Sequence, residues 1–211
     1  VHQGTSRSGV YAAVIADGAQ DLAAPPAAPG TGPTVLPNAP AVPPSTPSRG
    51  SSDPNALTVQ IFSDFQCPFC SRAVPTIDRV AQTYPQVRIV FRQMPLAFHN
   101  NAREAAEASL EVRAQAGDEA FWRYHDLLFA NQRALARADL ERYAQQVGGV
   151  NLARFRSALD QDVHAPQIDA DIAAAGTIGI RGTPSFVVGN QVVRGAQPFT
   201  AFEDAIDAQL P

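Results

Sequence analysis

The residues in this chain best able to do chemistry are its only two cysteines, which stand in one tetrapeptide, Cys67-Pro68-Phe69-Cys70. A disulfide closing so short a loop constrains the unfolded chain very little, so a purely structural cross-link explains the pair poorly. Two thiols at this spacing can instead exchange a disulfide with a partner. The first thiolate attacks and the second resolves the mixed disulfide. We expect Cys67 to be the nucleophile and Cys70 the resolving thiol.

The cysteine pair follows a predicted strand and opens a predicted helix. Apolar residues alternate with other residues over 57–62, and apolar residues at helical spacing extend from Cys67 to about Tyr84. Free backbone N–H groups and the helix dipole at a helix N-terminus favour a thiolate. Pro68 suits the first helical turn. The sequence therefore predicts a reactive thiol at a helix start.

A metal site is the alternative interpretation of paired cysteines. The chain has no further cysteine, and its histidines lack the spacing of zinc ligands; they are His2, His99, His125 and His164. We therefore expect neither a metal nor another cofactor, and redox chemistry is the favoured interpretation.

A second signal is the segment Gly182-Thr183-Pro184, directly before the apolar segment 185–188. A proline beside a sheet strand is unusual because it removes a ladder hydrogen-bond donor. A cis Thr183–Pro184 bond would turn the chain sharply and present the backbone of Thr183 outward. Thr-Pro alone is more often a trans turn, but its place before the last hairpin of a chain with C-x-x-C favours the cis form.

Composition divides the chain into three parts. Ten of its 18 prolines fall within residues 22–54, which predicts a Pro/Ala-rich extended linker. Residues 1–21 have apolar side chains at helical spacing, which leaves a short helix or a frayed tail open. Residues 55–211 form the domain, a normal size for one core. Its predicted order is β-α-β, an Ala-rich helical block over about 100–175, then β-β-α.

Charge and hydropathy exclude several classes of function. The net charge is −4, which argues against nucleic acid as a partner. All 16 basic residues are arginine, and the absence of lysine excludes Schiff-base chemistry and a P-loop. No apolar run is long enough to span a membrane. The chain starts at Val1 without a signal-peptide pattern, so we expect a piece of a longer protein.

Together these features resemble the DsbA family of thioredoxin-fold proteins. The resemblance covers about residues 55–211 and rests on Phe65-Gln66-Cys67-Pro68-Phe69-Cys70, the helical insertion, Gly182-Thr183-Pro184 and the β-β-α end. It implies an α/β architecture: a thioredoxin fold with an inserted α-helical domain, preceded here by the Pro-rich linker. By this resemblance Pro184 is the cis proline facing the active disulfide, and Thr183 offers backbone hydrogen bonds to a substrate peptide.

The sequence also departs from its relatives. Thioredoxins and many relatives carry a buried acid six residues before the first cysteine, where this chain has Ile61. Asp64 is a candidate acid–base substitute, and a polar turn residue is the alternative. Between the cysteines, Pro-Phe replaces the Pro-His of the strong oxidases. We therefore expect a less depressed Cys67 pKa and a less oxidising disulfide. Pro68 and an exposed Phe69 suit the binding of unfolded substrate chains.

The favoured function is an extracytoplasmic dithiol oxidase that forms disulfides in protein substrates through a Cys67 mixed disulfide. Its partners would be protein or peptide thiols and disulfides, with a membrane redox partner of the DsbB or VKOR type. A disulfide isomerase or reductase of the same fold would need a membrane reductant, because direction follows reduction potential. A peptide-binding chaperone module is a further alternative. We expect a periplasmic or otherwise extracytoplasmic location, with the linker as a membrane tether.

Overall fold

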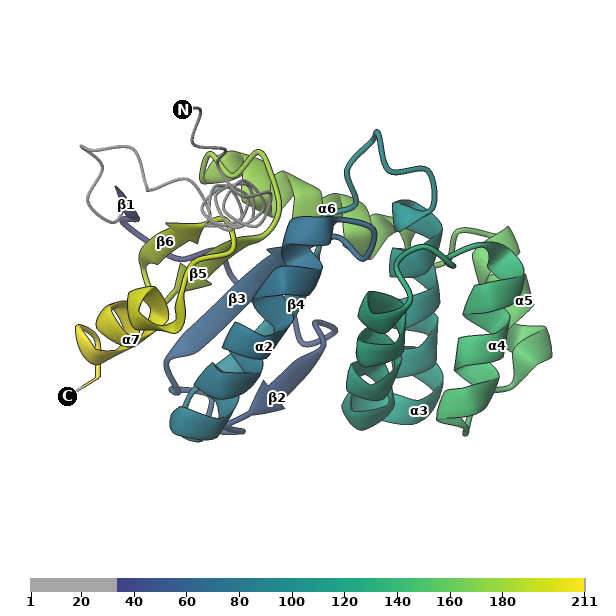
Figure 1. Cartoon of the computed structure of the whole chain (residues 1–211), viewed down its shortest axis with the longest axis horizontal. Helices are drawn as coiled ribbons and strands as arrows, with labels where there is room; N and C mark the ends of the chain where they lie inside the picture. Colours follow the sequence, from purple (N-terminus) through teal and green to yellow (C-terminus); the bar gives the residue numbers. More distant parts are fainter. Residues whose placement is uncertain (1–33, 211) are drawn as a thin grey trace, which may run out of the picture. The chain divides into compact units, whose positions relative to one another are not determined.

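The computed structural model describes residues 34–210. The predicted N-terminal segment 1–21 and residues 22–33 of the predicted linker lie outside the described residues. Figure 1 shows the elements, which follow in the order β1 (Thr34–Val35), β2 (Ser48–Gly50), β3 (Thr58–Ser63), α2 (Pro68–Thr83), β4 (Arg88–Gln93), α3 (Ala102–Ala130), α4 (Arg137–Val147), α5 (Leu152–Asp160), α6 (Ala165–Thr177), β5 (Ser185–Val188), β6 (Gln191–Arg194) and α7 (Phe199–Asp207).

The strands form one six-stranded sheet in the order β1-β6-β5-β3-β4-β2. Strand β3 lies inside it, parallel to β4 and antiparallel to β5. Side chains alternate between the two faces, so Ile61 packs with α2 and α7 while Phe62 packs with α6. Helices thus cover both faces, as Figure 1 shows, and β3 is buried almost throughout. This is the predicted thioredoxin-like α/β architecture.

The structure corrects the predicted linker over residues 34–54. Strand β1 pairs antiparallel with β6, and β2 pairs antiparallel with β4, so both sheet edges come from this segment. Between the two strands, the carbonyl of Pro40 accepts a hydrogen bond from Gln60 and the carbonyl of Ala41 accepts one from Arg92. A proline loses its own N–H but keeps its carbonyl. A proline-rich segment can therefore run along a folded core in an ordered conformation. We call residues 34–50 the strap.

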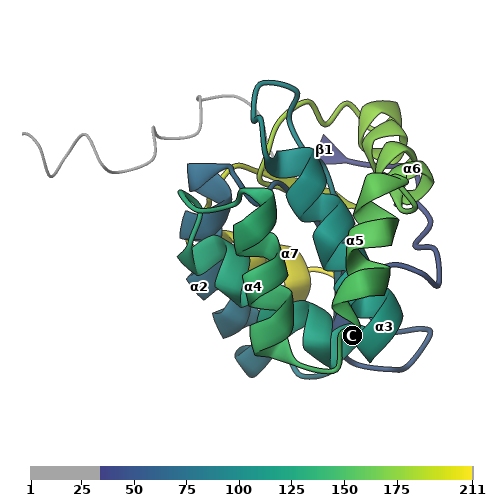
Figure 2. The ribbon, with the colours of Figure 1, turned by 90° about the vertical axis from the view of Figure 1, so that its right-hand side faces the viewer.

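The helical insertion between β4 and β5 comprises α3, α4, α5 and α6, over the predicted range. Helices α3, α4 and α5 pack against one another, as Figure 2 shows. Helix α3 is interrupted at Gly117, whose φ of 82° lies in the region that glycine adopts readily. Of the helices in residues 34–210, none combines the length and apolar character needed to cross a membrane.

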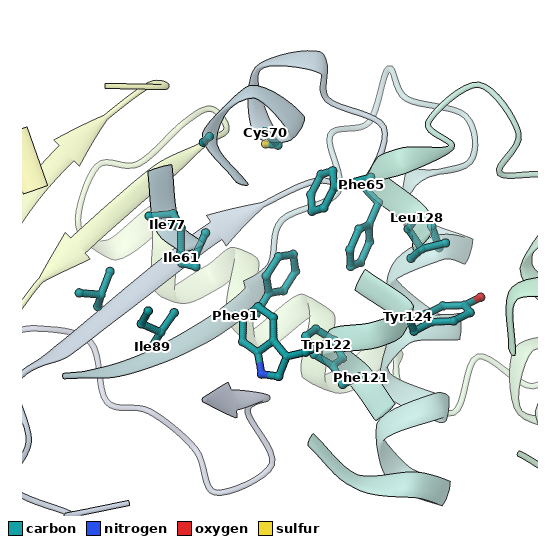
Figure 3. Packing of buried hydrophobic residues seen from close by; sticks show 14 of the residues in the cluster. Ile61, Phe65, Cys70, Ile77, Ile89, Phe91, Phe121, Trp122, Tyr124 and Leu128 are labelled. Carbon is teal, nitrogen blue, oxygen red and sulfur yellow. The ribbon is translucent and has the colours of Figure 1, made fainter. Parts of the chain in front are cut away.

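A cluster of buried aromatic side chains joins the insertion to the sheet (Figure 3). Phe91 from β4 stacks on Phe65 with ring centroids 5.1 Å apart, and it meets Phe121 and Trp122 of α3 edge to face. Tyr124, also on α3, is fully buried. Large aromatic rings bury much apolar surface and prefer such stacked and edge-to-face contacts. The insertion and the sheet therefore share one hydrophobic core.

A buried ion pair joins β4 to α6 on the face of the sheet opposite the aromatic cluster. Arg92 on β4 and Asp171 on α6 are 2% and 1% exposed, with 2.5 Å between Nε and Oδ1. The other carboxylate oxygen accepts a hydrogen bond from the backbone N–H of Gln93, and Arg92 Nη1 donates to Gln60 and Ala41. Buried charges are tolerated when they are paired and hydrogen-bonded. This cluster therefore couples the strap, the sheet and α6.

We predict that Asp171→Ala lowers the free energy of unfolding by about 3–5 kcal/mol, because it leaves the Arg92 charge buried without a partner. Asp169→Ala is the matched control on the same helix. It removes an exposed ion pair with Arg103, so we expect a loss below about 1 kcal/mol. Urea denaturation measures both values. Equal losses for the two variants would contradict the role given to the buried pair.

Candidate active site

Cys67 is the N-cap residue of α2, a helix of 16 residues with proline in its first turn. The carbonyl of Cys67 accepts hydrogen bonds from the backbone N–H groups of Cys70 and Ser71 at 3.1 and 3.3 Å, which begins the helix. No acidic residue stands in the first turn. The positive end of the helix dipole therefore acts on the Cys67 sulfur without a competing carboxylate.

Both cysteines are free thiols and nearly covered, with Cys67 3% and Cys70 2% exposed. The Cys67 sulfur lies 3.5 Å from the backbone carbonyl oxygen of Thr183, to which its protonated form donates a hydrogen bond. The Thr183–Pro184 peptide bond is cis. The C-x-x-C and Thr-Pro motifs, 116 residues apart in sequence, thus meet at the first sulfur.

The two sulfurs have pKa values that move in opposite directions. The pKa of Cys67 falls from 9.0 to about 5, chiefly because the Cys70 thiol donates a hydrogen bond to the Cys67 thiolate. Burial raises the pKa of Cys67 and so opposes this shift. Hydrogen bonds from the Thr183 side chain and from the backbone N–H groups of Cys70 and Phe69 lower the pKa further. Burial raises the pKa of Cys70 well above its usual value, and the neighbouring Cys67 charge raises it further. At neutral pH the pair is therefore a thiolate beside a thiol.

Because Pro-Phe replaces Pro-His between the cysteines, the sequence predicts a Cys67 pKa that is lowered less than in DsbA. At about 5 it lies above the value of about 3.5 for DsbA itself and below the value of about 7 for thioredoxin. A charged histidine between the cysteines is absent here, and the lowering comes from hydrogen bonds to the Cys67 thiolate.

Phe69, between the cysteines, is 51% exposed, and the guanidinium of Arg72 lies 4.3 Å from its ring centroid. A second exposed aromatic, Phe98, is 74% exposed on the loop after β4. The first turn of α2 therefore presents Phe69 outward beside the covered sulfurs.

Asp64 organises the turn before the cysteines. It is 2% exposed, and its Oδ1 accepts a hydrogen bond from the backbone N–H of Gln66 at 2.7 Å. Its Oδ2 accepts one from the backbone N–H of Leu96 at 2.7 Å and lies 2.8 Å from His99 Nδ1. Within residues 34–210, no hydrogen bond joins this carboxylate to either sulfur. These contacts favour the turn role over the acid–base role.

Two residues of the site escaped the sequence analysis. Gln132, just after α3, donates from Nε2 to the carbonyls of Phe65 and Cys67, both at 2.8 Å. Its carboxamide therefore holds the helical insertion to the cysteine turn. Ser63 hydrogen-bonds to Cys70 through its side chain, which lowers the Cys70 pKa against the effect of burial. A glutamine in a polar loop and a serine at a strand end carry no local sequence signal for such contacts.

A cavity of about 20 Å³ lies beside Cys70. Its walls include Ser63, Ile61, Pro184 and His125. Figure 3 shows Ile61, Cys70 and Phe91 among the labelled side chains of the buried cluster. Among residues 34–210, no group of three or more histidine, cysteine, aspartate or glutamate side chains is placed to hold a metal ion.

Three features occur together beside the sheet: a thiolate at a helix start, a buried second thiol one turn later, and a Thr-Pro turn against the first sulfur. This arrangement, on a thioredoxin fold with a helical insertion, is typical of thiol–disulfide oxidoreductases.

The chain belongs to the DSBA-like thioredoxin domain family, whose family model matches residues 58–207. Oxidised BdbD from Bacillus subtilis shares the fold, with a TM-score of 0.73 at 22% identity over 82% of this chain and 97% of that one. A thioredoxin-like oxidoreductase from Silicibacter pomeroyi DSS-3 is 31% identical, with a TM-score of 0.65 over 79% of this chain and 92% of that one.

Sequence similarity also extends to longer proteins. The Na(+)/H(+) antiporter NhaA 3 of Salinispora tropica is 39% identical over 151 residues, which are 71% of this chain and 22% of that protein. The chain therefore spans about a fifth of the length of the curated relatives it matches.

We predict that Cys67 in the reduced protein titrates with a midpoint near pH 5. The thiolate is the reactive form, so alkylation by iodoacetamide should accelerate as the pH rises through this value and then level off. Cys70→Ala removes the largest cause of the lowered pKa, so its midpoint should move upward. A wild-type midpoint near the unperturbed value of about 8.5 would contradict the proposed hydrogen bond between the thiols.

Proposed function

We propose that Cys67 and Cys70 are the reactive pair of this oxidoreductase. The observation that carries the proposal is the opposite shift of the two pKa values within one helical turn. A substrate thiolate attacks the Cys67 sulfur of the oxidised pair, and Cys70 leaves as a thiolate and takes up a proton. A second substrate thiolate then attacks the substrate sulfur of the mixed disulfide, and Cys67 leaves. Two electrons thus pass from the substrate dithiol to the pair.

We propose that the favoured direction is oxidation of substrate dithiols. A low thiol pKa stabilises the reduced form of the pair and makes Cys67 a good leaving group. The Cys67 pKa of about 5 supports this direction. The same stabilisation of the reduced form makes DsbA a strong oxidant.

The proposed substrates are thiols of unfolded proteins or peptides. The carbonyl of Thr183 contacts the Cys67 sulfur, so the backbone before Pro184 is adjacent to any chain bound at that sulfur. Pro68 and the exposed Phe69 form the neighbouring surface on the first turn of α2. An extended peptide joined to Cys67 would therefore contact the Thr183 backbone on one side and Phe69 on the other.

The proposed setting is an oxidising compartment outside the cytoplasm. A solved structure with this fold, at 21% identity and a TM-score of 0.65, is a periplasmic thioredoxin-like protein from Salmonella enterica serovar Typhimurium. An oxidase must return two electrons from its reduced pair to an acceptor, and we propose a membrane partner of the DsbB or VKOR type for this step. Similar sequence occurs within proteins named Na(+)/H(+) antiporters, which favours a place next to a membrane. Attachment through the N-terminal residues is part of the same proposal. Antiport itself is not proposed for a chain that spans about a fifth of those proteins.

We predict a reduction potential for the Cys67–Cys70 pair between the about −120 mV of DsbA and the about −270 mV of thioredoxin, nearer to the DsbA value. The reason is that its Cys67 pKa lies between those of DsbA and thioredoxin. Equilibration in glutathione buffers, with the oxidised fraction read by thiol alkylation, measures the potential. A value near the about −270 mV of thioredoxin would make the protein a reductase or isomerase instead.

Cysteine variants separate thiol exchange from a chaperone role. We predict that Cys67→Ser abolishes disulfide exchange with reduced and oxidised peptide substrates, because no nucleophile remains at the helix start. Cys70→Ser, the matched variant, keeps Cys67 and should accumulate a mixed disulfide that gel electrophoresis detects without reductant. If Cys67→Ser retains the exchange rate of the wild type, the assignment of Cys67 fails. A chaperone module would suppress substrate aggregation equally well in all three proteins.

A further inference from the structure

The proposed reaction requires Cys70 to lose and regain a proton inside the molecule. Cys70 is 2% exposed, and burial makes its thiolate costly. The neighbouring Ile61 is apolar, and both oxygens of Asp64 are engaged by Gln66, Leu96 and His99. The Cys70 proton therefore needs an exchange partner other than these two residues.

The cavity beside Cys70 offers a route for that proton. Its volume of about 20 Å³ exceeds the roughly 10–15 Å³ of such space that one water molecule requires. A buried water also needs two to four polar partners. Besides the Cys70 sulfur, the lining includes Ser63, Arg49 and His125, and the remaining walls are apolar. A water placed there would have the Cys70 thiol and the His125 ring among the groups that surround it.

The surroundings of His125 leave one of its ring nitrogens as a proton acceptor. It is 4% exposed, and its ring meets Phe91, Trp122 and Phe129 with centroids 5.3, 4.9 and 4.8 Å away. Its Nδ1 lies 2.8 Å from the carboxylate of Asp126. A carboxylate accepts the proton of Nδ1–H, which leaves Nε2 as the acceptor nitrogen of the neutral ring. The aromatic packing fixes the ring in this position.

The charges around His125 act on it from three elements. Burial is the largest effect and lowers the pKa of His125; Arg49 on β2 lowers it further, while Asp126 on α3 and Asp78 on α2 raise it. The net direction is downward from the ordinary value of 6.5, so the ring is mainly neutral at neutral pH. A neutral imidazole can take up a proton.

We propose that His125 accepts the Cys70 proton through a water molecule in this cavity when Cys70 resolves the mixed disulfide, and returns it in the reverse step. This inference rests on the proposed function. In the resolving step the Cys70 S–H bond breaks, the Cys70 sulfur bonds to Cys67, and the bond from Cys67 to the partner sulfur breaks. The partner leaves as a thiolate with the electron pair, and the proton resides on His125 Nε2 until the substrate thiolate or solvent takes it.

Rapid mixing of the reduced protein with excess oxidised glutathione separates the two steps. The first step, formation of the Cys67–glutathione disulfide, depends on glutathione concentration, and the second, resolution by Cys70, does not. We expect His125→Phe to slow resolution at pH 7 by at least about tenfold, because general-base assistance contributes about 10²–10⁴ in rate. The inflection of the wild-type rate below pH 6.5 should disappear in this variant. The first step should be unchanged.

His164→Phe is the matched control. This histidine also contacts a carboxylate, that of Glu111, at 2.8 Å, but it lies at the start of α6 and away from the cavity. We expect its resolution rate and pH profile to equal those of the wild type. A folded His125→Phe protein with the wild-type rate and profile would overturn the inference.

A measurement on the wild-type protein keeps the inference testable if His125→Phe does not fold. The midpoint of the His125 imidazole titration, followed by NMR, should coincide with the inflection of the resolution rate. Different midpoints overturn the role of His125. The proposed function fails separately, through absence of the first step, because no glutathione disulfide would then form on Cys67.

Discussion

The antiparallel register of β3 with β5 is the constraint on which the rest of the site depends. Phe62 pairs with Ser185, so the end of β3 and the start of β5 lie side by side. The turn to Cys67 continues from one strand, and Thr183 precedes the other. A shift of one residue would turn every side chain of β3 to the opposite face and separate the Cys67 sulfur from the Thr183 carbonyl. Sheet register thus fixes the chemistry at the start of α2.

The core protects this register from both sides. On one face, α2 and α7 pack on the sheet together with the aromatic cluster of the insertion. On the other, the buried pair of Arg92 and Asp171 joins β4 to α6 and receives the strap through the Ala41 carbonyl. Gln132 then connects the insertion to the cysteine turn itself. Packing therefore positions the domain, and a few directed hydrogen bonds set the last details of the site.

Sequence reasoning recovered the parts of the fold that have strong local signals. The strand–helix junction at Cys67, the helical insertion and the final β-β-α unit carry regular apolar spacing, and the structure has elements there. It failed for residues 34–54, because proline content predicts an extended backbone but not whether a sheet edge will accept it.

Within the candidate site, the recognised pattern joins residues close in sequence, whereas the missed contacts join residues far apart in sequence. Cys67 and Cys70 are neighbours in sequence, so their pairing was visible. Gln132 acts on Cys67 from 65 residues away, and His125 lines the cavity beside Cys70 from the C-terminal part of α3. Such contacts exist only after the insertion has packed, and no local pattern encodes them.

The short strands β1 and β2 also bear on how a protein proposed to act on unfolded chains would avoid unwanted strand pairing with them. An open sheet edge is a template on which an extended polypeptide adds another strand and starts aggregation. Here β6 and β4 are covered by strands of two and three residues, with Pro37 and Pro47 close by. Because such short edges offer few unpaired N–H and C=O groups, an extended polypeptide finds little backbone to pair with along either edge of this sheet.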